Sequence, residues 1–114
     1  MISVADGVGG WNSKEVDSGR YARFLCKRMG EIYGTDNSKT LKNILYEAAA
    51  EAFQLGGSST CVSAKLEPEI KNDAVKMAAL NLGDSAYMIL RPETDGSIKT
   101  IERSVENVFK FNGP

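Results

Sequence analysis

The sequence predicts an α+β fold, in which two helices are followed by antiparallel strands. Three observations lead to this prediction. The 114 residues are 42% hydrophobic and 25% charged, which is the composition of an ordinary globular domain. Apolar side chains repeat with a helical period over residues 41–53. After the double glycine at 56–57 the period changes to the strict alternation of a strand over residues 60–66. A chain of this length forms one domain.

The first predicted elements are a short strand and a helix. Residues 2–5 form an apolar run that ends in the glycine-rich stretch 6–11, which is typical of a strand entering a turn. A helix is expected to begin near Asp17 or Ser18, because either side chain can cap it. Its apolar side consists of Tyr21, Ala22, Leu25, Met29 and Tyr33. Gly30 is expected to weaken the end of this helix, as is Gly34.

The second helix, residues 41–53, has the clearest pattern. Its apolar residues form one stripe at helical spacing: Leu41, Ile44, Leu45, Ala48, Ala49, Ala52 and Phe53. Asp36, Asn37 or Ser38 is expected to cap its start, and Gly56–Gly57 to stop it.

Strands are predicted for the second half of the chain. Residues 60–66 alternate, so one face of this strand is expected to be buried. Residues 67–73 are polar, contain Pro68 and are interpreted as a connection. Strands then follow at 75–82, 86–91 and 98–103. The turns between them are predicted at Gly83-Asp84-Ser85, as a hairpin tip, and at Asp95-Gly96.

Composition excludes several function classes. The chain has no histidine, so it contains neither a Ser-His-Asp triad nor an imidazole metal ligand. Its net charge of −1 argues against nucleic acid or an anionic membrane as the main partner. Cys26 and Cys61 match no metal-binding spacing and are predicted to be buried free thiols of a reducing compartment. Without a signal peptide or spanning segment, the chain is expected to be soluble and intracellular.

The first candidate site is the turn after the first strand. Asp6 is followed by Gly7, whose bare backbone lets a carbonyl approach a ligand closely. A carboxylate and a carbonyl suit a hard divalent cation such as magnesium or manganese. The alternative is that the two residues only form a turn. A phosphate-cradling loop is weakly supported, because neither GxGxxG nor a Walker lysine is present.

Other polar residues have simpler interpretations. Asp84, the second candidate, stands at the predicted hairpin tip, where an aspartate commonly bonds its own backbone. The Trp11 ring is expected to pack in the core or against a loop, with its NH finding an acceptor. Charged side chains are expected to form solvated faces, and Lys65 and Glu67 are among them.

Four motifs, taken in order, resemble a known family. They are Val4–Trp11 (VADGVGGW), Gly57–Thr60 (GSST), Asn81–Ser85 (NLGDS) and Phe111–Pro114 (FNGP). In this order and at these distances they resemble the type 2C metal-dependent protein serine/threonine phosphatases, the PPM family. The sequence is most similar to the branch with organellar members, which carries DGVGGW where others carry DGHGG.

The resemblance implies a fold and an activity. It implies a phosphatase-2C-type β-sandwich, of which this chain is a part, with antiparallel strands flanked by two helices. The activity it implies is hydrolysis of phosphoserine and phosphothreonine in a phosphoprotein substrate. Two manganese or magnesium ions between the sheets would activate a water that attacks phosphorus. By the same resemblance, Asp6 bridges the ions, Gly7 ligates through its carbonyl, and Asp84 belongs to an additional, weaker ion.

The sequence also departs from the family pattern. Val8 stands where many family members have a histidine thought to protonate the leaving alcohol, and valine cannot donate a proton. By the same resemblance Thr60 and Ser85 are structural. The expected compartment is the cytoplasm or, if a transit peptide lies upstream of Met1, a mitochondrion or plastid, where members of this branch are found.

The family domain has roughly 250 residues, so residues 1–114 are expected to be a single, incomplete catalytic domain. By the resemblance, the N-terminal strands and the C-terminal half of the metal site are expected to be missing. We therefore expect a truncated gene model, a fragment or one piece of a split enzyme, inactive alone and prone to self-association through exposed strand edges. The alternatives are a non-catalytic module that binds a partner, and an unrelated α+β domain with an accidental turn.

Overall fold

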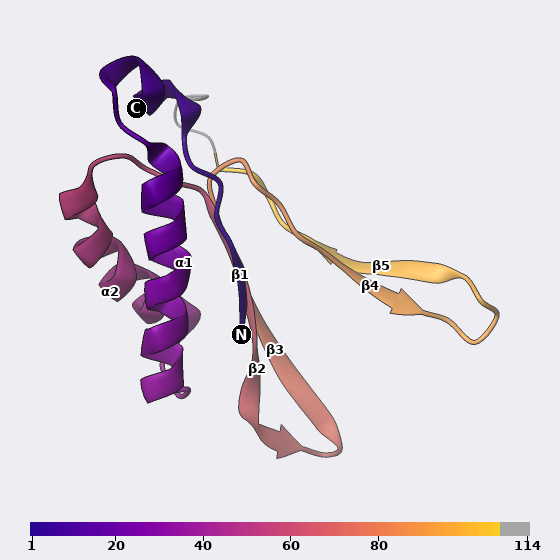
Figure 1. The fold of residues 1–114 in the computed structure, drawn as a ribbon. Coiled ribbons are helices and arrows are strands. Elements are labelled where there is room, and N and C mark those ends of the chain that lie inside the picture. The colour runs from indigo at the N-terminus through magenta and orange to yellow at the C-terminus, as the bar shows by residue number, and fades with distance from the viewer. Residues whose placement is uncertain (108–114) are drawn as a thin grey trace.

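The computed structural model describes residues 1–107, so the motif at 111–114 lies outside the described residues. Figure 1 shows the order of the elements along the chain. They are β1 (Ile2–Val4), the 3-10 helix η1 (Gly9–Lys14), α1 (Ser18–Thr35), α2 (Leu41–Ala52), the 3-10 turn η2 (Phe53–Leu55), β2 (Cys61–Lys71), β3 (Ala74–Leu82), β4 (Met88–Pro92) and β5 (Ile98–Arg103). None of the helices in this range is long and apolar enough to cross a membrane.

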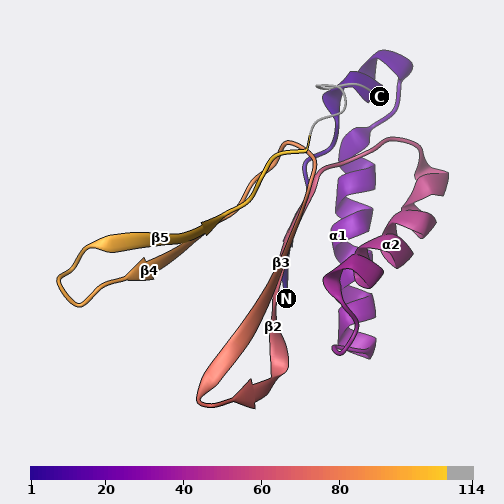
Figure 2. The same cartoon turned by 180° about the vertical axis from the view of Figure 1, so that it is seen from behind.

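The strands form two separate antiparallel sheets. One has the order β1-β2-β3, and β4 and β5 form a hairpin by themselves. Helices α1 and α2 cover one face of the three-stranded sheet, and the β4–β5 hairpin projects away from it, as Figure 2 shows from behind. The predicted α+β class is therefore confirmed. The arrangement is compatible with part of a phosphatase-2C-like domain.

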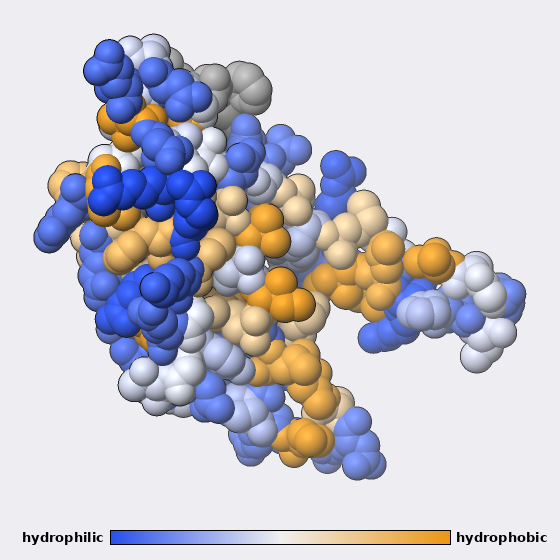
Figure 3. All heavy atoms as spheres, in the orientation of Figure 1, coloured by the Kyte–Doolittle hydropathy of each residue, from blue (hydrophilic) through white to orange (hydrophobic). Residues whose placement is uncertain are grey.

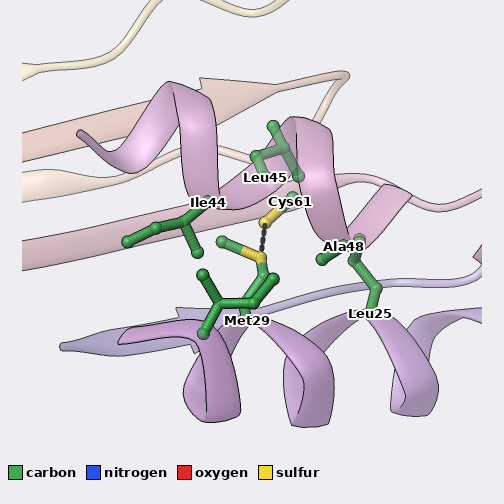
Figure 4. Packing of buried hydrophobic residues seen from close by; sticks show 7 residues of the cluster. Leu25, Met29, Ile44, Leu45, Ala48 and Cys61 are labelled. Atoms are coloured by element: carbon green, nitrogen blue, oxygen red, sulfur yellow. Dashed lines mark hydrogen bonds between the residues drawn. The ribbon is translucent and has the colours of Figure 1, made fainter. Parts of the chain in front are cut away.

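The core lies between the two helices and the sheet. Leu25 and Met29 of α1 meet Ile44 and Ala48 of α2, and Cys61 of β2 closes the cluster (Figure 4). The predicted helical stripes are confirmed at these positions. Phe53 is the exception, because it is 82% exposed. The helix ends at Ala52, and the tighter 3-10 turn that begins at Phe53 rotates this ring off the stripe.

The helix ends differ in part from the prediction. Asp17 caps α1 as expected, accepting a hydrogen bond from the Gly19 amide at 2.9 Å. Helix α2 is capped instead by Thr40, whose hydroxyl oxygen accepts from the Asn43 amide at 3.1 Å. Helix α1 also continues through Gly30 to Thr35, because burial of its apolar side outweighs the weak helix propensity of glycine.

The predicted connection at residues 67–73 is wrong. Strand β2 runs to Lys71, and only Asn72 and Asp73 form the turn, with φ of 50° and 58°. Positive φ at both central residues is the geometry of a tight two-residue hairpin. Pro68 falls within the register shift between Leu66 and Ile70, where a strand tolerates a residue without an amide hydrogen.

The two faces of the sheet differ in what covers them. On the side of the helices lie Cys61, Ser63 and Lys65, which are buried. Lys65 was predicted on a solvated face, and this is wrong. Its ammonium donates to the carbonyl oxygens of Asn37 at 3.1 Å and Lys39 at 2.6 Å, so it fastens the connection between the helices to the sheet.

We call the opposite side of the sheet the helix-free face. Its members follow from the register, because directly paired residues of an antiparallel sheet point to the same side. They are Ile2, Val4, Val62, Ala64, Leu66, Ile70, Val75, Met77, Ala79 and Asn81. All but Asn81 are apolar. Six of the seven larger apolar side chains among them are between 40% and 74% exposed, and the seventh, Val62, is partly buried.

Candidate metal site at the Asp6–Gly7 turn

The Asp6–Gly7 turn prolongs the pairing of β1 with β2. The Thr60 amide donates to the Asp6 carbonyl at 2.9 Å, and the Val8 amide donates to the Ser58 carbonyl at 2.9 Å. Gly7 lies opposite Ser59 between these two bonds. In an antiparallel ladder the residue between two such bonds directs its own amide and carbonyl away from the partner strand. The Gly7 carbonyl therefore faces the open edge of the sheet.

Gly7 is also pressed against the start of α1. A Cβ at this position would lie 2.5 Å from the Ser18 carbonyl oxygen, so only glycine fits. The Cβ direction of Gly7 thus points toward the helices. Successive side chains of an extended chain alternate, so Asp6 projects to the helix-free side, as Val4 does. The Asp6 side chain is exposed there.

Thr60 joins the two candidate segments. Its hydroxyl accepts from the Asp6 amide at 3.3 Å and shares a hydrogen bond with the Ser85 hydroxyl at 2.6 Å. Gly83 packs on the same side chain, since a Cβ there would lie 2.9 Å from the Thr60 methyl. The segments that carry Asp6 and Asp84 are therefore held by one buried threonine. No sequence spacing indicates this contact, because 54 residues separate Asp6 from Thr60.

Asp84 does not lie at a hairpin tip, and that prediction is wrong. Strand β3 pairs with β2 and β4 pairs with β5, so residues 83–85 link two sheets. The β3 end of the link is held by two hydrogen bonds, in which the Asn107 amide donates to the Gly83 carbonyl at 2.9 Å and the Asn81 side-chain amide donates to the Val105 carbonyl at 3.0 Å. The Asp84 side chain itself is exposed.

The two candidate aspartates differ from the turn-forming ones. The carboxylate of Asp36 accepts hydrogen bonds from the hydroxyl and the amide of Ser38, and these bonds lower its pKa. Ser97 does the same for Asp95. Within residues 1–107 the carboxylate of Asp6 makes no hydrogen bond or ion pair, and neither does that of Asp84. Their oxygens are therefore available to a ligand from solvent.

The glycine-rich stretch after Asp6 is anchored by its tryptophan. The Trp11 ring NH donates to the Ser58 hydroxyl at 2.8 Å, which confirms the predicted acceptor for this ring. The Lys14 ammonium lies 5.2 Å from the centre of the same ring. Helix η1 is thus tied to the segment before β2, which also carries the backbone partners of the Asp6–Gly7 turn.

The cysteines offer no second site. Both are free; Cys61 is buried with its sulfur 3.8 Å from that of Met29, and Cys26 is only partly buried. Burial raises the pKa of both thiols, so neither is an activated nucleophile.

The Asp6–Gly7 turn offers only a few ligands to a metal ion. The Asp6 carboxylate and Gly7 carbonyl are oxygen ligands of the kind that magnesium and manganese prefer. Magnesium takes about six such ligands, including waters. Among the described residues no group of three or more Cys, Asp or Glu side chains could hold a metal ion. The donors therefore fit a hard cation in kind, but their number falls short of a complete site.

Comparison with known proteins identifies similar sequences. The chain is 32% identical over 121 residues to protein phosphatase PTC7 homolog fig of Drosophila pseudoobscura pseudoobscura and 33% identical to that of Drosophila yakuba. It is 35% identical over 119 residues to that of Drosophila grimshawi. These alignments cover 99–100% of the chain but only 33–36% of the relatives, so the chain spans about a third of their length. No protein-family model and no solved structure matches.

Proposed function

We propose that the chain is part of the catalytic domain of a type 2C metal-dependent protein phosphatase, which hydrolyses phosphoserine and phosphothreonine in proteins. One observation carries the proposal. Over its whole length the chain is similar to proteins named as protein phosphatases. The geometry agrees with this observation, because the exposed Asp6 side chain adjoins a Gly7 carbonyl that faces an open sheet edge.

In this proposal the residues have distinct roles. Asp6 and Gly7 help to hold a pair of manganese or magnesium ions, and Asp84 contributes to a third ion. Bound divalent ions lower the pKa of a coordinated water and neutralise charge on phosphoryl oxygens. Val8 cannot supply a proton, so the leaving oxygen takes its proton from water or from another group.

The small number of metal ligands favours one alternative. If this polypeptide acts alone, it is a catalytically incomplete module that binds a partner or a phosphoprotein without hydrolysing it. The observation that favours this alternative is the absence of a cluster of three ligating side chains among residues 1–107. In either case we place the protein inside the cell, in the cytoplasm or in a mitochondrion or plastid, where free cysteines persist.

Calorimetric titration with manganese tests the site. We expect weak binding by the native chain and none by Asp6→Ala, because that variant loses the proposed carboxylate ligand. Glu93→Ala is the control, since it removes the same charge from the far turn of the β4–β5 hairpin and should bind as the native chain does. Equal binding by the native chain and Asp6→Ala would remove Asp6 from any metal site.

A phosphatase assay with manganese and a phosphoserine peptide tests the activity. The chain alone is expected to be inactive or nearly so, because the donor set is incomplete. Turnover on the order of 1 s⁻¹, an ordinary enzymatic rate, would contradict the proposed incompleteness. Such turnover, if abolished by Asp6→Ala, would still support the phosphatase assignment.

A further inference from the structure

Asn81 is a polar exception that the proposed function leaves unexplained. It lies near the end of β3, opposite Val62, and it is the only polar residue of the helix-free face. Figure 3 shows apolar atoms in orange along the arm formed by β2 and β3, and also along the projecting β4–β5 arm. The Asn81 side chain thus lies between apolar arms, just before the link at residues 83–85 that carries Asp84.

The side-chain amide of Asn81 binds two different segments of the chain. Its Nδ2 donates to the Val105 carbonyl, which follows β5, at 3.0 Å, and to the Gly83 carbonyl at 3.5 Å. A primary amide carries two N–H donors on one atom, so one short side chain can hold both carbonyls. An aspartate would turn a charged oxygen toward these carbonyls, a serine offers one donor and a leucine offers none. The two bonds therefore depend on an amide at this position.

The other end of the same amide has no partner. In the part of the chain that the structure describes, Oδ1 of Asn81 is the one buried side-chain nitrogen or oxygen without a hydrogen bond. Turning the amide over would not satisfy it, because Oδ1 would then face two carbonyl oxygens, which accept and cannot donate. A buried acceptor without a donor lowers stability. This cost offsets part of what the two donated bonds contribute, so their larger effect is on the geometry of the segments that they join.

The Gly83 carbonyl connects Asn81 to Asp84. The atoms of one peptide unit lie in a plane, so the Gly83 oxygen moves together with the amide and the Cα of Asp84. This oxygen also accepts from the Asn107 amide at 2.9 Å. On the other side of Asp84, the Ser85 hydroxyl bonds the buried Thr60 hydroxyl at 2.6 Å. The backbone is therefore held on both sides of an exposed carboxylate, which has no hydrogen bond or ion pair of its own to a described residue.

We propose that Asn81 is a positioning residue, whose amide holds the link between the two sheets so that the Asp84 carboxylate is ready for a divalent cation. The inference rests on the proposed function, in which Asp84 contributes to an additional ion. A ligand that is held in place before the ion arrives loses less freedom on binding than a mobile one. The bond to Val105 serves the same end, because it ties the chain that returns from β5 to the end of β3.

Magnesium titration of the full chain, followed by the chemical shifts of its amide NMR signals, tests the inference. Magnesium is diamagnetic, so the shifts report on each site locally. In the native chain we expect the signals of Asp84 and Ser85 to move at lower magnesium concentration than that of Glu93, an exposed carboxylate on the far turn of the β4–β5 hairpin. In Asn81→Leu the midpoint for Asp84 should rise about tenfold, the order expected if the ion must now order the backbone of one residue.

The signal of Gly7 is the internal control. The Asp6–Gly7 turn is held by Thr60 and the segment before β2, and not by Asn81, so its midpoint should be unchanged in Asn81→Leu. Asn43→Leu is the matched control variant. It makes the same exchange at an exposed position of α2, so the midpoint for Asp84 should equal that of the native chain.

Two further variants of Asn81 complete the test. Asn81→Gln keeps both N–H donors on a side chain that is one methylene longer, so it should restore part of the affinity lost in Asn81→Leu. Asn81→Thr offers one donor on a β-branched side chain that suits a strand. It serves if the leucine variant does not fold, and its midpoint for Asp84 should also rise above that of the native chain.

The possible failures have different meanings. An unchanged Asp84 midpoint in Asn81→Leu, or equal losses in the glutamine and leucine variants, would overturn the inference and leave the proposed metal site intact. An equal rise at Gly7 would also overturn it, because the substitution would then act on the fold as a whole. An Asp84 signal that responds no earlier than Glu93 in the native chain would overturn both the inference and the assignment of Asp84 to an additional ion. A missing response at Gly7 alone would count against the Asp6 site, and the Asp84 midpoints would still decide the inference.

Discussion

Replacement of Gly7 by alanine should destabilise the fold more than the same replacement at any other glycine near the candidate site. The new Cβ would lie 2.5 Å from the Ser18 carbonyl oxygen and 2.6 Å from its carbonyl carbon. Both atoms belong to the backbone at the first turn of α1, so no side-chain rotation relieves the overlap. The turn must therefore move away from the helix, and this movement would disturb the pairing of Asp6 with Thr60.

We expect this change to lower the free energy of unfolding by about 3 kcal/mol, the upper end of the range for overpacking. That loss is a large part of the 5–15 kcal/mol available to a typical domain. The measurement is urea denaturation followed by circular dichroism, at one low protein concentration so that self-association contributes equally.

Gly30→Ala is the matched control for this prediction. Gly30 lies inside α1 with nothing within 4 Å of where its Cβ would stand. The same methyl group should therefore stabilise the protein by about 0.5 to 1 kcal/mol, the usual gain in a helix interior. A Gly7→Ala variant as stable as the native chain would refute the close packing of the turn on α1.

Two further predictions concern polar contacts. Thr60→Val keeps the shape of the side chain but removes the hydroxyl, which leaves the Asp6 amide and the Ser85 hydroxyl without their partner. Urea denaturation should show that the free energy of unfolding falls by about 1–3 kcal/mol. Manganese should also bind this variant more weakly than it binds Thr60→Ser, which keeps the hydroxyl. Binding equal to that of the native chain would show that Thr60 does not position Asp6. The second prediction concerns pH. Arg28 bonds Glu51 at 2.7 Å and holds the pKa of Glu51 below its ordinary value of 4.5. The folded state therefore binds fewer protons than the unfolded state near that pH, so this contribution is present above pH 4.5 and is lost as the pH falls through the lowered pKa. Thermal melts between pH 7 and 3 should show a shallower acid slope for Arg28→Gln, and an unchanged slope would contradict the assignment.

Local patterns predicted most of the secondary structure correctly. The helical stripe of α2 and the Asp17 cap of α1 depend on neighbouring residues, so they can be recognised without the fold. The error at residues 67–73 has a physical reason. In the sequence alone Pro68 looks like a strand breaker, but the irregular pairing between Leu66 and Ile70 accommodates it.

The candidate site could be predicted only as a set of residues. The sequence indicates Asp6, Gly7 and Asp84 through their types and through a family resemblance. It cannot indicate that Thr60 bonds both segments, because that contact depends on how β1 pairs with β2 and where β3 ends. Lys65 shows the same limit. A lysine is solvated by default, and only the position of the helix connection places two backbone carbonyls around its ammonium.

The sequence by itself determined the classes of chemistry open to this protein. The absence of histidine excludes imidazole chemistry whatever the fold, and the aspartate before a glycine turn makes an oxygen-ligated cation a prediction that no structural observation here tests. Which side of a strand meets the helices is a different kind of question. Over residues 61–64 both sides of β2 carry small or apolar side chains, so alternation alone leaves the choice open, and packing of α1 and α2 on Cys61 decided it. That choice left Ile2, Val4 and Leu66 on the uncovered side, and it turned the Asp6 carboxylate toward the same side.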